Sequence, residues 1–316
     1  METVGKEAVI ESGTSKAAKE AEERLYGYYG LKWHDHYVSV GGLDLRVTEI
    51  GTGDPILVIP GGTGEAFPLA PLFAELAGKS IFAVNLPGSG LSGSMDYRRH
   101  DFHTLAIDVI TSVLDTLHLD GATLMGHSIG AHWCLWFAID HPDKVGRLIL
   151  LGAPGHVDAA QPPLALRLMS VPYVNRAMRM SSIIGGKDQA LSALKFMGHS
   201  QETLGLLPSA MSHCFYQFAK LPGSELSAIS MLETTNRLFG KRPEIFIGRA
   251  DLVRVRAPSL LLWGTRDPFG SSEVGFEIAK AMKECRFREI RRGGHFPWLE
   301  NPVECGELIL EFDRKN

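Results

Sequence analysis

Short apolar runs, each followed closely by a glycine, recur along most of this chain. The clearest of them span residues 56–59, 81–84, 123–125, 148–151 and 260–263. Continuous apolar runs of about four residues are typical of parallel strands that are buried on both faces. Segments with helical character alternate with these runs, which predicts an α/β fold with a mostly parallel, doubly wound sheet. Ligands bind to such sheets at the carboxyl ends of the strands, where the glycine turns lie.

The first part of the chain has a different pattern. Residues 1–35 are expected to form a lead followed by a helix over residues 15–29, which are rich in Ala, Glu and Lys. Alternating residues 36–40 and 43–47 flank Gly41-Gly42, and this arrangement predicts a β-hairpin.

The strand pattern stops between residues 155 and 255, which divides the predicted core into residues 36–154 and 256–316. The inserted segment has helical periodicity, and Pro162-Pro163, Gly185-Gly186 and Pro222-Gly223 divide it into several helices. It holds six of the ten methionines, namely Met169, Met178, Met180, Met197, Met211 and Met231. We expect a helical cap over the strand ends whose flexible thioethers line an apolar pocket. The alternative is a helical appendage that only packs against the core.

Composition narrows the possible functions. The 316 residues are 45% hydrophobic, and 32 Lys and Arg against 36 Asp and Glu leave a net charge of −4. The apolar content excludes general disorder, and the acidic balance argues against a nucleic-acid partner. The four cysteines are isolated along the chain, and we find no apolar stretch that resembles a signal peptide or a membrane span. We therefore expect a cytoplasmic protein with reduced thiols, no metal, no cofactor and no membrane partner.

The segment Gly126-His127-Ser128-Ile129-Gly130 matches the pattern G-x-S-x-G. A strand-like segment precedes it and an apolar, helix-like segment, residues 131–138, follows it. A serine in a sharp strand-to-helix turn needs small neighbours, because the strand and the helix pack closely there. The turn exposes the hydroxyl above the sheet and directs a helix N-terminus towards it. Ser128 is therefore predicted to be a nucleophile.

A serine nucleophile needs a base to accept its proton. His295 lies in a glycine-rich segment after the predicted strand 287–290 and is the candidate base. The imidazole needs an acid that fixes its tautomer, and Asp267 follows the strand 260–263 at the position for this role. Asp158, which also follows a strand, is the alternative acid.

Together, these segments resemble the α/β-hydrolase superfamily, in the capped branch that holds esterases and C–C bond hydrolases. The resemblance covers residues 38–312, and the chain order Ser128, Asp267, His295 is that of the superfamily. Its anchors are the segments 60–62, 85–92, 126–130 and 295–302 and the loop that holds Asp267. The resemblance implies an oxyanion hole formed by the backbone N–H groups of Gly62 and Ile129.

Five residues are candidates for substrate contact: Thr63, His127, Met169, Met211 and Phe296. For His127 the alternative is a packing role beside the elbow. Two positions depart from the usual pattern of the superfamily, because Pro60 replaces a common His and Asn85 a common Asp. The loss of that His puts the geometry of the oxyanion loop in question more than the chemistry.

Residues 88–93 also match the dinucleotide fingerprint G-x-G-x-x-G, but no apolar helix follows them, so we do not expect a nucleotide site. The favoured function is a serine hydrolase that cleaves an ester or lactone of a small hydrophobic substrate through an acyl-enzyme. The alternatives are a C–C bond hydrolase with the same triad and a non-catalytic receptor for a small ligand. Ser128 disfavours the dehalogenases and epoxide hydrolases of this fold, which use a carboxylate nucleophile.

Overall fold

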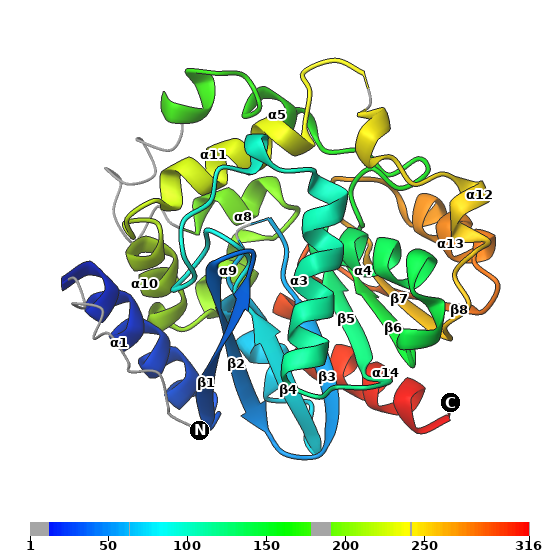
Figure 1. The fold of residues 1–316 in the computed structure, drawn as a ribbon, viewed down its shortest axis with the longest axis horizontal. Coiled ribbons are helices and arrows are strands. Elements are labelled where there is room, and N and C mark those ends of the chain that lie inside the picture. Colours follow the sequence, from blue (N-terminus) through cyan, green and yellow to red (C-terminus); the bar gives the residue numbers. More distant parts are fainter. Residues whose placement is uncertain (1–12, 63, 178–190, 241, 316) are drawn as a thin grey trace.

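One eight-stranded sheet runs through the described part of the chain (Figure 1). The structure is a computed structural model, and it describes residues 13–62, 64–177, 191–240 and 242–315. The strand order is β1-β2-β4-β3-β5-β6-β7-β8. β1 pairs with β2 and β2 with β4 in antiparallel fashion, and all later pairs are parallel. The doubly wound, mostly parallel sheet expected from the sequence is confirmed.

Each apolar run of the sequence forms a strand. The strands are β1 (Trp33–Val40), β2 (Leu43–Gly51), β3 (Asp54–Ile59), β4 (Lys79–Val84), β5 (Thr123–His127), β6 (Arg147–Leu151), β7 (Ser259–Gly264) and β8 (Cys285–Ile290). β1 and β2 form the predicted hairpin, with Val40 opposite Leu43 across the two-glycine turn.

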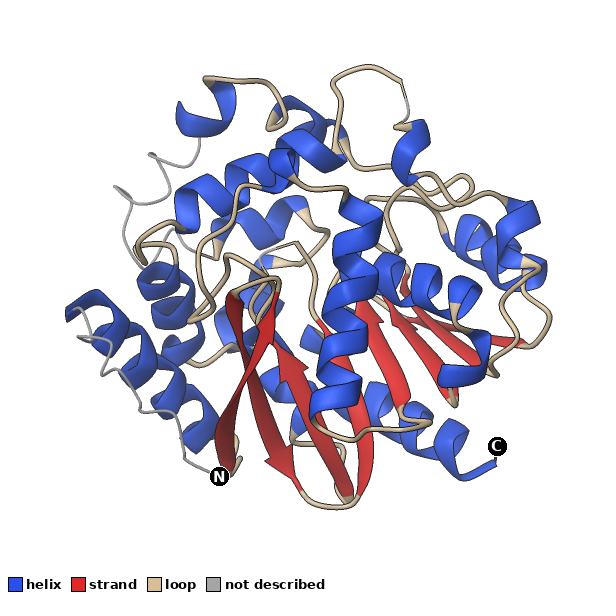
Figure 2. Cartoon of the chain, in the orientation of Figure 1, coloured by secondary structure: helices blue, strands red, loops and turns tan. Residues whose placement is uncertain are grey.

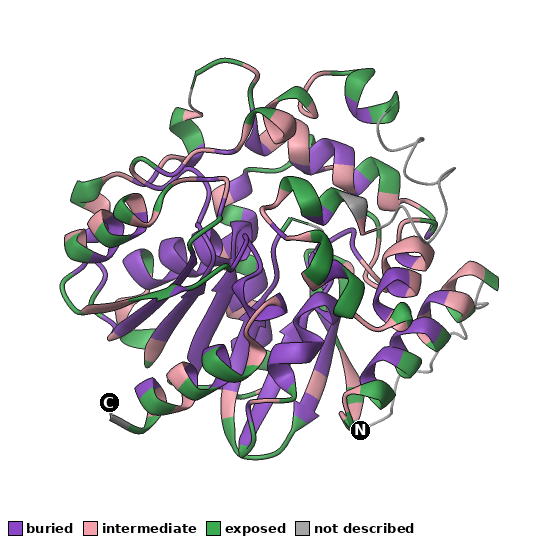
Figure 3. Cartoon of the chain, turned by 180° about the vertical axis from the view of Figure 1, so that it is seen from behind, coloured by how far each residue is buried: buried purple, intermediate pink, exposed green. Residues whose placement is uncertain are grey.

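Both faces of the sheet are covered, as the continuous apolar runs require. Along β6, Leu148 and Leu150 belong to one apolar cluster, whereas Ile149 and Leu151 belong to the other. Successive side chains of a strand point to opposite faces, so a strand buried on both faces must be apolar at every position. Figure 3 shows the central strands as buried along most of their length.

Helices flank the sheet on both sides (Figure 2). The first cluster includes side chains from α3 (Phe102–Thr116), α4 (Ile129–Asp140) and α13 (Ser272–Ala281). The second includes side chains from α1 (Gly13–Tyr28), α2 (Ala70–Phe73) and α14 (Pro302–Lys315). Short 3-10 turns lie at η1 (Phe67–Leu69), η2 (Tyr97–Arg99), η3 (Pro142–Lys144), η4 (Pro243–Ile245) and η5 (Pro297–Leu299). No helix among the described residues is both long and apolar enough to cross a bilayer.

The segment between β6 and β7 is helical, as its periodicity indicates. Its described helices are α5 (Leu164–Leu168), α8 (Ser192–Phe196), α9 (Gln201–Leu206), α10 (Ser209–Phe218), α11 (Ser224–Thr235) and α12 (Arg249–Leu252). In Figure 1, α5 and α11 lie above the sheet. Met178, Met180 and the Gly185-Gly186 break lie outside the described residues.

Both ends of this insert contribute side chains to the apolar core. Val157 and Ile247 form an isolated parallel bridge and, with Leu252 and Val255, join the apolar cluster that contains α3 and α4. The interval 155–255 therefore includes residues that help to build the core. At the other boundary, β1 begins at Trp33, inside the segment 1–35 that was expected to hold only a lead and a helix.

Candidate active site

Ser128 lies in a strained turn between β5 and α4. Its backbone has φ 53° and ψ −116°, a left-handed conformation that non-glycine residues rarely adopt. A Cβ at Gly126 would lie 2.5 Å from the Cα of Ala131, and a Cβ at Gly130 would lie 2.1 Å from the carbonyl oxygen of Ile59. Both glycines of the pattern are therefore required by steric contact, which is the physical reason for the motif.

The structure brings Ser128, His295 and Asp267 into one hydrogen-bonded chain. The Ser128 Oγ lies 2.8 Å from the Nε2 of His295, and the Nδ1 of His295 lies 2.9 Å from the Oδ2 of Asp267. The backbone N–H groups of Ala153 and Phe269 also donate to the Asp267 carboxylate, at 2.9 and 3.0 Å. With Nδ1 donating to the carboxylate, Nε2 is free to accept the serine proton.

The imidazole is held in a nearly dry environment. The His295 side chain is 4% exposed and that of Asp267 is fully buried. Phe269 stacks on the His295 ring with a centroid distance of 4.2 Å and an interplanar angle of 11°. A low local dielectric strengthens the interaction between the carboxylate and an imidazolium, so this packing favours charge development during proton transfer.

Two backbone segments meet beside Ser128. Ile129 is the first residue of α4, so its N–H has no hydrogen-bond partner within the helix. This N–H lies at the helix N-terminus, which is the positive end of the helix dipole. The loop after β3 approaches from the other side, and a Cβ on Gly61 would lie 3.3 Å from that of Ser128. A Cβ on Gly62 would meet no atom within 4 Å, so this residue borders open space. Thr63 lies outside the described residues.

The loop after β3 keeps a defined shape, although Pro60 and Asn85 differ from the residues that are usual in the superfamily. Gly64 N–H donates to the Gly61 carbonyl at 2.7 Å, and its own carbonyl accepts from Leu86 N–H at 2.8 Å. The buried Asn85 accepts the backbone N–H of Ala66 through Oδ1 at 3.3 Å. Asn85 therefore ties the end of β4 to the loop, which supplies a direct anchor for its conformation.

His127 and Phe296 pack against His295. His127 is 1% exposed, and its Nε2 lies 3.0 Å from the carbonyl oxygen of His295, to which it donates. The ring of Phe296 lies 4.4 Å from that of His127. Burial and the nearby His295 lower the pKa of His127 well below its usual value, which makes the ring a poor proton acceptor. The structure thus gives His127 the packing position that was the alternative to substrate contact.

The two methionines proposed as substrate contacts have different surroundings. Met211 in α10 is 1% exposed and packs within the apolar cluster of α1 and α2. Met169 follows α5 and is half-buried. The alternative acid, Asp158, forms an ion pair with Arg249 at 3.1 Å. The carboxylate that accepts the hydrogen bond from His295 is therefore that of Asp267 and not that of Asp158.

One group of contacts at the site has no motif in the sequence. The backbone N–H of Phe296 donates to the Nε2 of His199 at 3.2 Å, so Nδ1 carries the proton and donates to Glu300 at 2.7 Å. Glu300 also accepts from Gly294 N–H at 3.2 Å, and His295 N–H donates to the Met197 carbonyl at 2.8 Å. Residues of the insert and Glu300 therefore hold the loop that carries His295 from both sides of this residue.

Replacement of His199 by alanine is expected to lower kcat by about 10–100-fold, because small errors in the position of a catalytic group cost about this much. KM should change less, since the loop positions the base and does not bind substrate. Steady-state kinetics and thermal unfolding should be measured together. His103→Ala is a matched control, because His103 pairs with Asp140 on the surface at 2.8 Å. An unchanged kcat with a lower Tm would leave His199 with a purely structural role.

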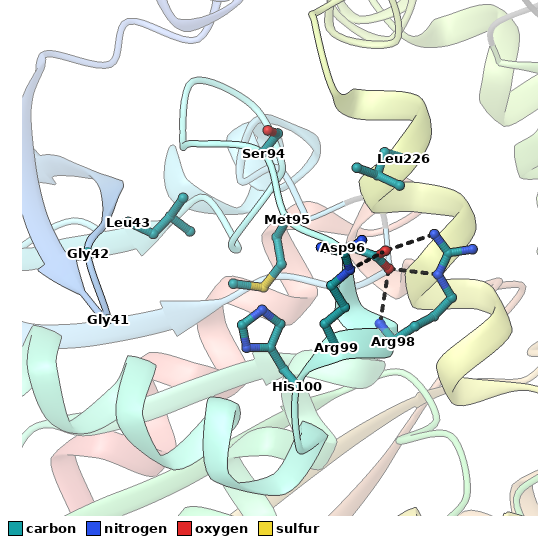
Figure 4. Close-up of a pocket in the computed structure, with 10 residues that line it drawn as sticks. All are labelled: Gly41, Gly42, Leu43, Ser94, Met95, Asp96, Arg98, Arg99, His100 and Leu226. Carbon is teal, nitrogen blue, oxygen red and sulfur yellow. Dashed lines mark hydrogen bonds and ion pairs between the residues drawn. The ribbon is translucent and has the colours of Figure 1, made fainter.

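A surface cleft of about 610 Å³ lies beside the β1–β2 turn (Figure 4). It is lined by Gly41, Gly42, Leu43, Ser94, Met95, Asp96, Arg98, Arg99, His100 and Leu226. At its edge the loop after β4 is joined to α11, since Met95 N–H donates to Ser227 at 3.2 Å and Arg98 pairs with Glu233 at 3.1 Å. This lining includes neither Ser128 nor His295. The candidate site is therefore identified by the side chains of Ser128, His295 and Asp267, and this cleft is not part of it.

Comparison with known proteins agrees with the fold. Residues 54–302 match the model of the alpha/beta hydrolase fold family. A relative from Burkholderia vietnamiensis, named 2-hydroxy-6-oxononadienedioate/2-hydroxy-6-oxononatrienedioate hydrolase, is 28% identical over 303 residues, covering 88% of this chain and 95% of the relative.

Two solved structures show the same fold. The carboxylesterase CesB (YbfK) from Bacillus subtilis superposes with a TM-score of 0.72 at 16% identity, over 96% of this chain and 99% of that protein. A variant of the meta-cleavage product hydrolase CumD has a TM-score of 0.67 at 17% identity, over 89% and 98% of the two chains. From the family match, the fold and the named relatives, this chain is a hydrolase and belongs to the alpha/beta hydrolase fold family.

Proposed function

We propose that this hydrolase cleaves a carbon–carbon bond next to a ketone, with Ser128 as nucleophile, His295 as base and acid, and Asp267 as the group that orients His295. The proposed attack by Ser128 is supported by the hydrogen-bonded chain from its Oγ through His295 to Asp267, with distances of 2.8 and 2.9 Å. This arrangement can raise the nucleophilicity of a hydroxyl towards a carbonyl carbon.

The type of bond is inferred from the relatives. Their named substrate carries carboxylates, a hydroxyl and a ketone, but neither an ester nor an amide. Hydrolysis of such a molecule must break a carbon–carbon bond, and the bond beside the ketone is the one that nucleophilic attack on its carbonyl weakens. This evidence favours the C–C hydrolase alternative over the ester or lactone hydrolase that was the first expectation from the sequence.

The first half of the proposed reaction forms an acyl-enzyme. Ser128 Oγ attacks the ketone carbon while His295 Nε2 accepts the hydroxyl proton. The backbone N–H groups of Gly62 and Ile129 stabilise the resulting oxyanion. Because the carbon beside the ketone is a vinyl carbon in the dienol, the dienol must first ketonise: its hydroxyl loses a proton, and the carbon beside the ketone gains one. When the attacked carbonyl re-forms, the adjacent C–C bond breaks, and its electron pair passes through the remaining double bond to the newly formed keto group of the departing chain. His295 gives its proton to that chain.

The second half restores the enzyme. His295 removes a proton from water, the hydroxide attacks the acyl carbon, and the ester bond to Ser128 breaks with return of the proton to Oγ. Phe269 stacks on the His295 ring and presents apolar surface beside it, which favours a hydrophobic acyl group over a charged one. We therefore propose a small substrate with an apolar acyl portion.

Two substrates with the same acyl group test the proposal. 2-Hydroxy-6-oxo-6-phenylhexa-2,4-dienoate and p-nitrophenyl benzoate would both give a benzoyl-enzyme, but only the first requires C–C cleavage. We expect kcat/KM for the dienoate to exceed that for the ester by more than about tenfold, equivalent to about 1.4 kcal/mol in the transition state. Loss of the dienol absorbance and release of benzoate would be measured.

The same pair of substrates can contradict the proposal. If the enzyme hydrolysed p-nitrophenyl benzoate rapidly and did not cleave the dienoate, it would be an ester hydrolase with this triad. A dicarboxylate analogue that is cleaved much faster than the phenyl compound would refute the apolar acyl group while preserving C–C cleavage.

A further inference from the structure

A second cluster of reactive side chains lies on the β1–β2 hairpin, on strands that do not carry the catalytic groups. His34, His36 and Glu49 each present one ligand atom, and these atoms all lie within 4.8 Å of one another. β1 is the edge strand of the sheet, at the outer side of the hairpin in Figure 1. The cluster is open to solvent, with side-chain exposures of 61% for His34, 29% for His36 and 22% for Glu49.

The strand geometry brings the three residues together. His34 and His36 are two positions apart on β1, so their side chains leave the same face of the sheet. Glu49 on β2 is directly opposite His34 in the antiparallel register and diagonal to His36. The intervening Asp35 points to the other face, where it pairs with Arg46 at 2.9 Å.

Both histidines converge on a single carboxylate oxygen of Glu49. The Nε2 atoms of His34 and His36 lie 3.1 and 2.7 Å from the same oxygen, Oε2 of Glu49. The other oxygen of this carboxylate accepts the hydroxyl of Ser80 on β4 at 3.0 Å. Ser80 thus orients the carboxylate, as an outer-shell partner does in metal sites.

We propose that His34, His36 and Glu49 bind one Zn²⁺ ion, with water at the remaining position. Two imidazole nitrogens and one carboxylate oxygen form a ligand set that zinc accepts, and three protein ligands leave one position of its tetrahedron open. Zinc lies about 2.0–2.2 Å from such ligands, which places neighbouring ligand atoms about 3.3–3.5 Å apart. The observed separations of 3.1 and 2.7 Å therefore need to open by less than an ångström.

The bound ion would clamp the free edge strand to its neighbour. Among the described residues, β1 has a hydrogen-bonded neighbouring strand on one side only, since it ends the strand order. A metal that joins β1 to β2 opposes fraying of this edge, because its binding free energy adds to the stability of the folded state. Ser128 and His295 follow β5 and β8, so this clamp is separate from the hydrolytic chemistry.

Zinc titration of the full-length, tag-free protein tests the site. Isothermal calorimetry with ZnCl₂ should show one ion per chain and a rise in Tm on binding. His34→Ala and His36→Ala should each weaken binding by at least about 100-fold, since loss of an outer-shell partner alone costs about 10–100-fold. Ser80→Ala should weaken it by about tenfold for that same reason. Co²⁺ in place of Zn²⁺ should give visible bands that both histidine variants abolish.

His103→Ala is the matched control, because His103 and Asp140 form a histidine–carboxylate pair without a third ligand in the described part of the chain. It should bind Zn²⁺ as the parent does. Circular dichroism without metal checks that each variant is folded, and His34→Gln provides a second, bulkier replacement at an exposed position. Stoichiometric zinc binding that survives in the His34→Ala/His36→Ala double variant, or no zinc binding by the parent protein, would overturn the proposal.

Discussion

Replacement of Ser128 by alanine is expected to lower kcat by about 10⁶-fold, the size of loss seen when the nucleophile of a comparable triad is removed. The variant retains His295, Asp267 and both oxyanion segments, but it has no hydroxyl that could form the acyl-enzyme. A fluorophosphonate probe should label the parent once per chain and leave Ser128→Ala unlabelled. Labelling and turnover would be measured on the same preparations.

Ser212→Ala is a suitable control, because Ser212 in α10 and Ser128 are equally buried, each 8% exposed. This control should be labelled and active like the parent. Ser128→Gly should be as inactive as Ser128→Ala but more stable, by about 1–3 kcal/mol, since glycine relieves the strain of φ 53°. Turnover that survives in Ser128→Ala would show that another group attacks the substrate.

Replacement of Asp267 by asparagine is expected to lower kcat by about 10⁴-fold. An amide NH₂ in place of Oδ2 would donate to Nδ1 of His295, which forces the ring proton onto Nε2 and prevents it from accepting the Ser128 proton. Because Oδ2 also accepts Ala153 N–H and Oδ1 accepts Phe269 N–H, either orientation of the amide loses a buried hydrogen bond. A stability loss of about 1–3 kcal/mol should accompany the change.

Asp158→Asn is the control for this prediction, because Asp158 is the other carboxylate that the sequence offers as the acid. Its ion pair with Arg249, at 3.1 Å, lies on a partly exposed surface and should matter little for stability. We expect nearly full activity in Asp158→Asn. If Asp267→Asn kept nearly full activity, the triad assignment would be wrong, and the enzyme would work with Ser128 and His295 alone.

The strands and the elbow could be predicted from the sequence because local constraints specify them. A strand buried on both faces must be apolar at every position, and β6 is such a strand. In the elbow, a Cβ at Gly126 or Gly130 would approach backbone atoms to within 2.5 Å. Such requirements act between residues that are close in the sequence, so they produce a pattern that the sequence shows directly.

The extent of the insert was harder to predict. Val157 and Ile247 are apolar like the residues of a cap, yet they belong to the core cluster of α3 and α4, and an isolated bridge pairs them across 90 residues of the chain. Helical periodicity does not reveal which neighbour an apolar residue meets. His199 likewise has no motif, because its partners Glu300 and Phe296 come from a distant segment.

The sequence by itself determined the sheet, the nucleophile turn and the two candidate acids, because short-range steric and apolar constraints specify each of them. Only the tertiary structure decided that Asp267 accepts a hydrogen bond from His295, that His199 supports the loop that carries His295, and that His34 and His36 meet at one oxygen of Glu49. These arrangements depend on strand register and on how distant loops pack, since side chains interact only over a few ångströms. Proximity of this kind is a property of the folded chain, and the order of residues does not encode it locally.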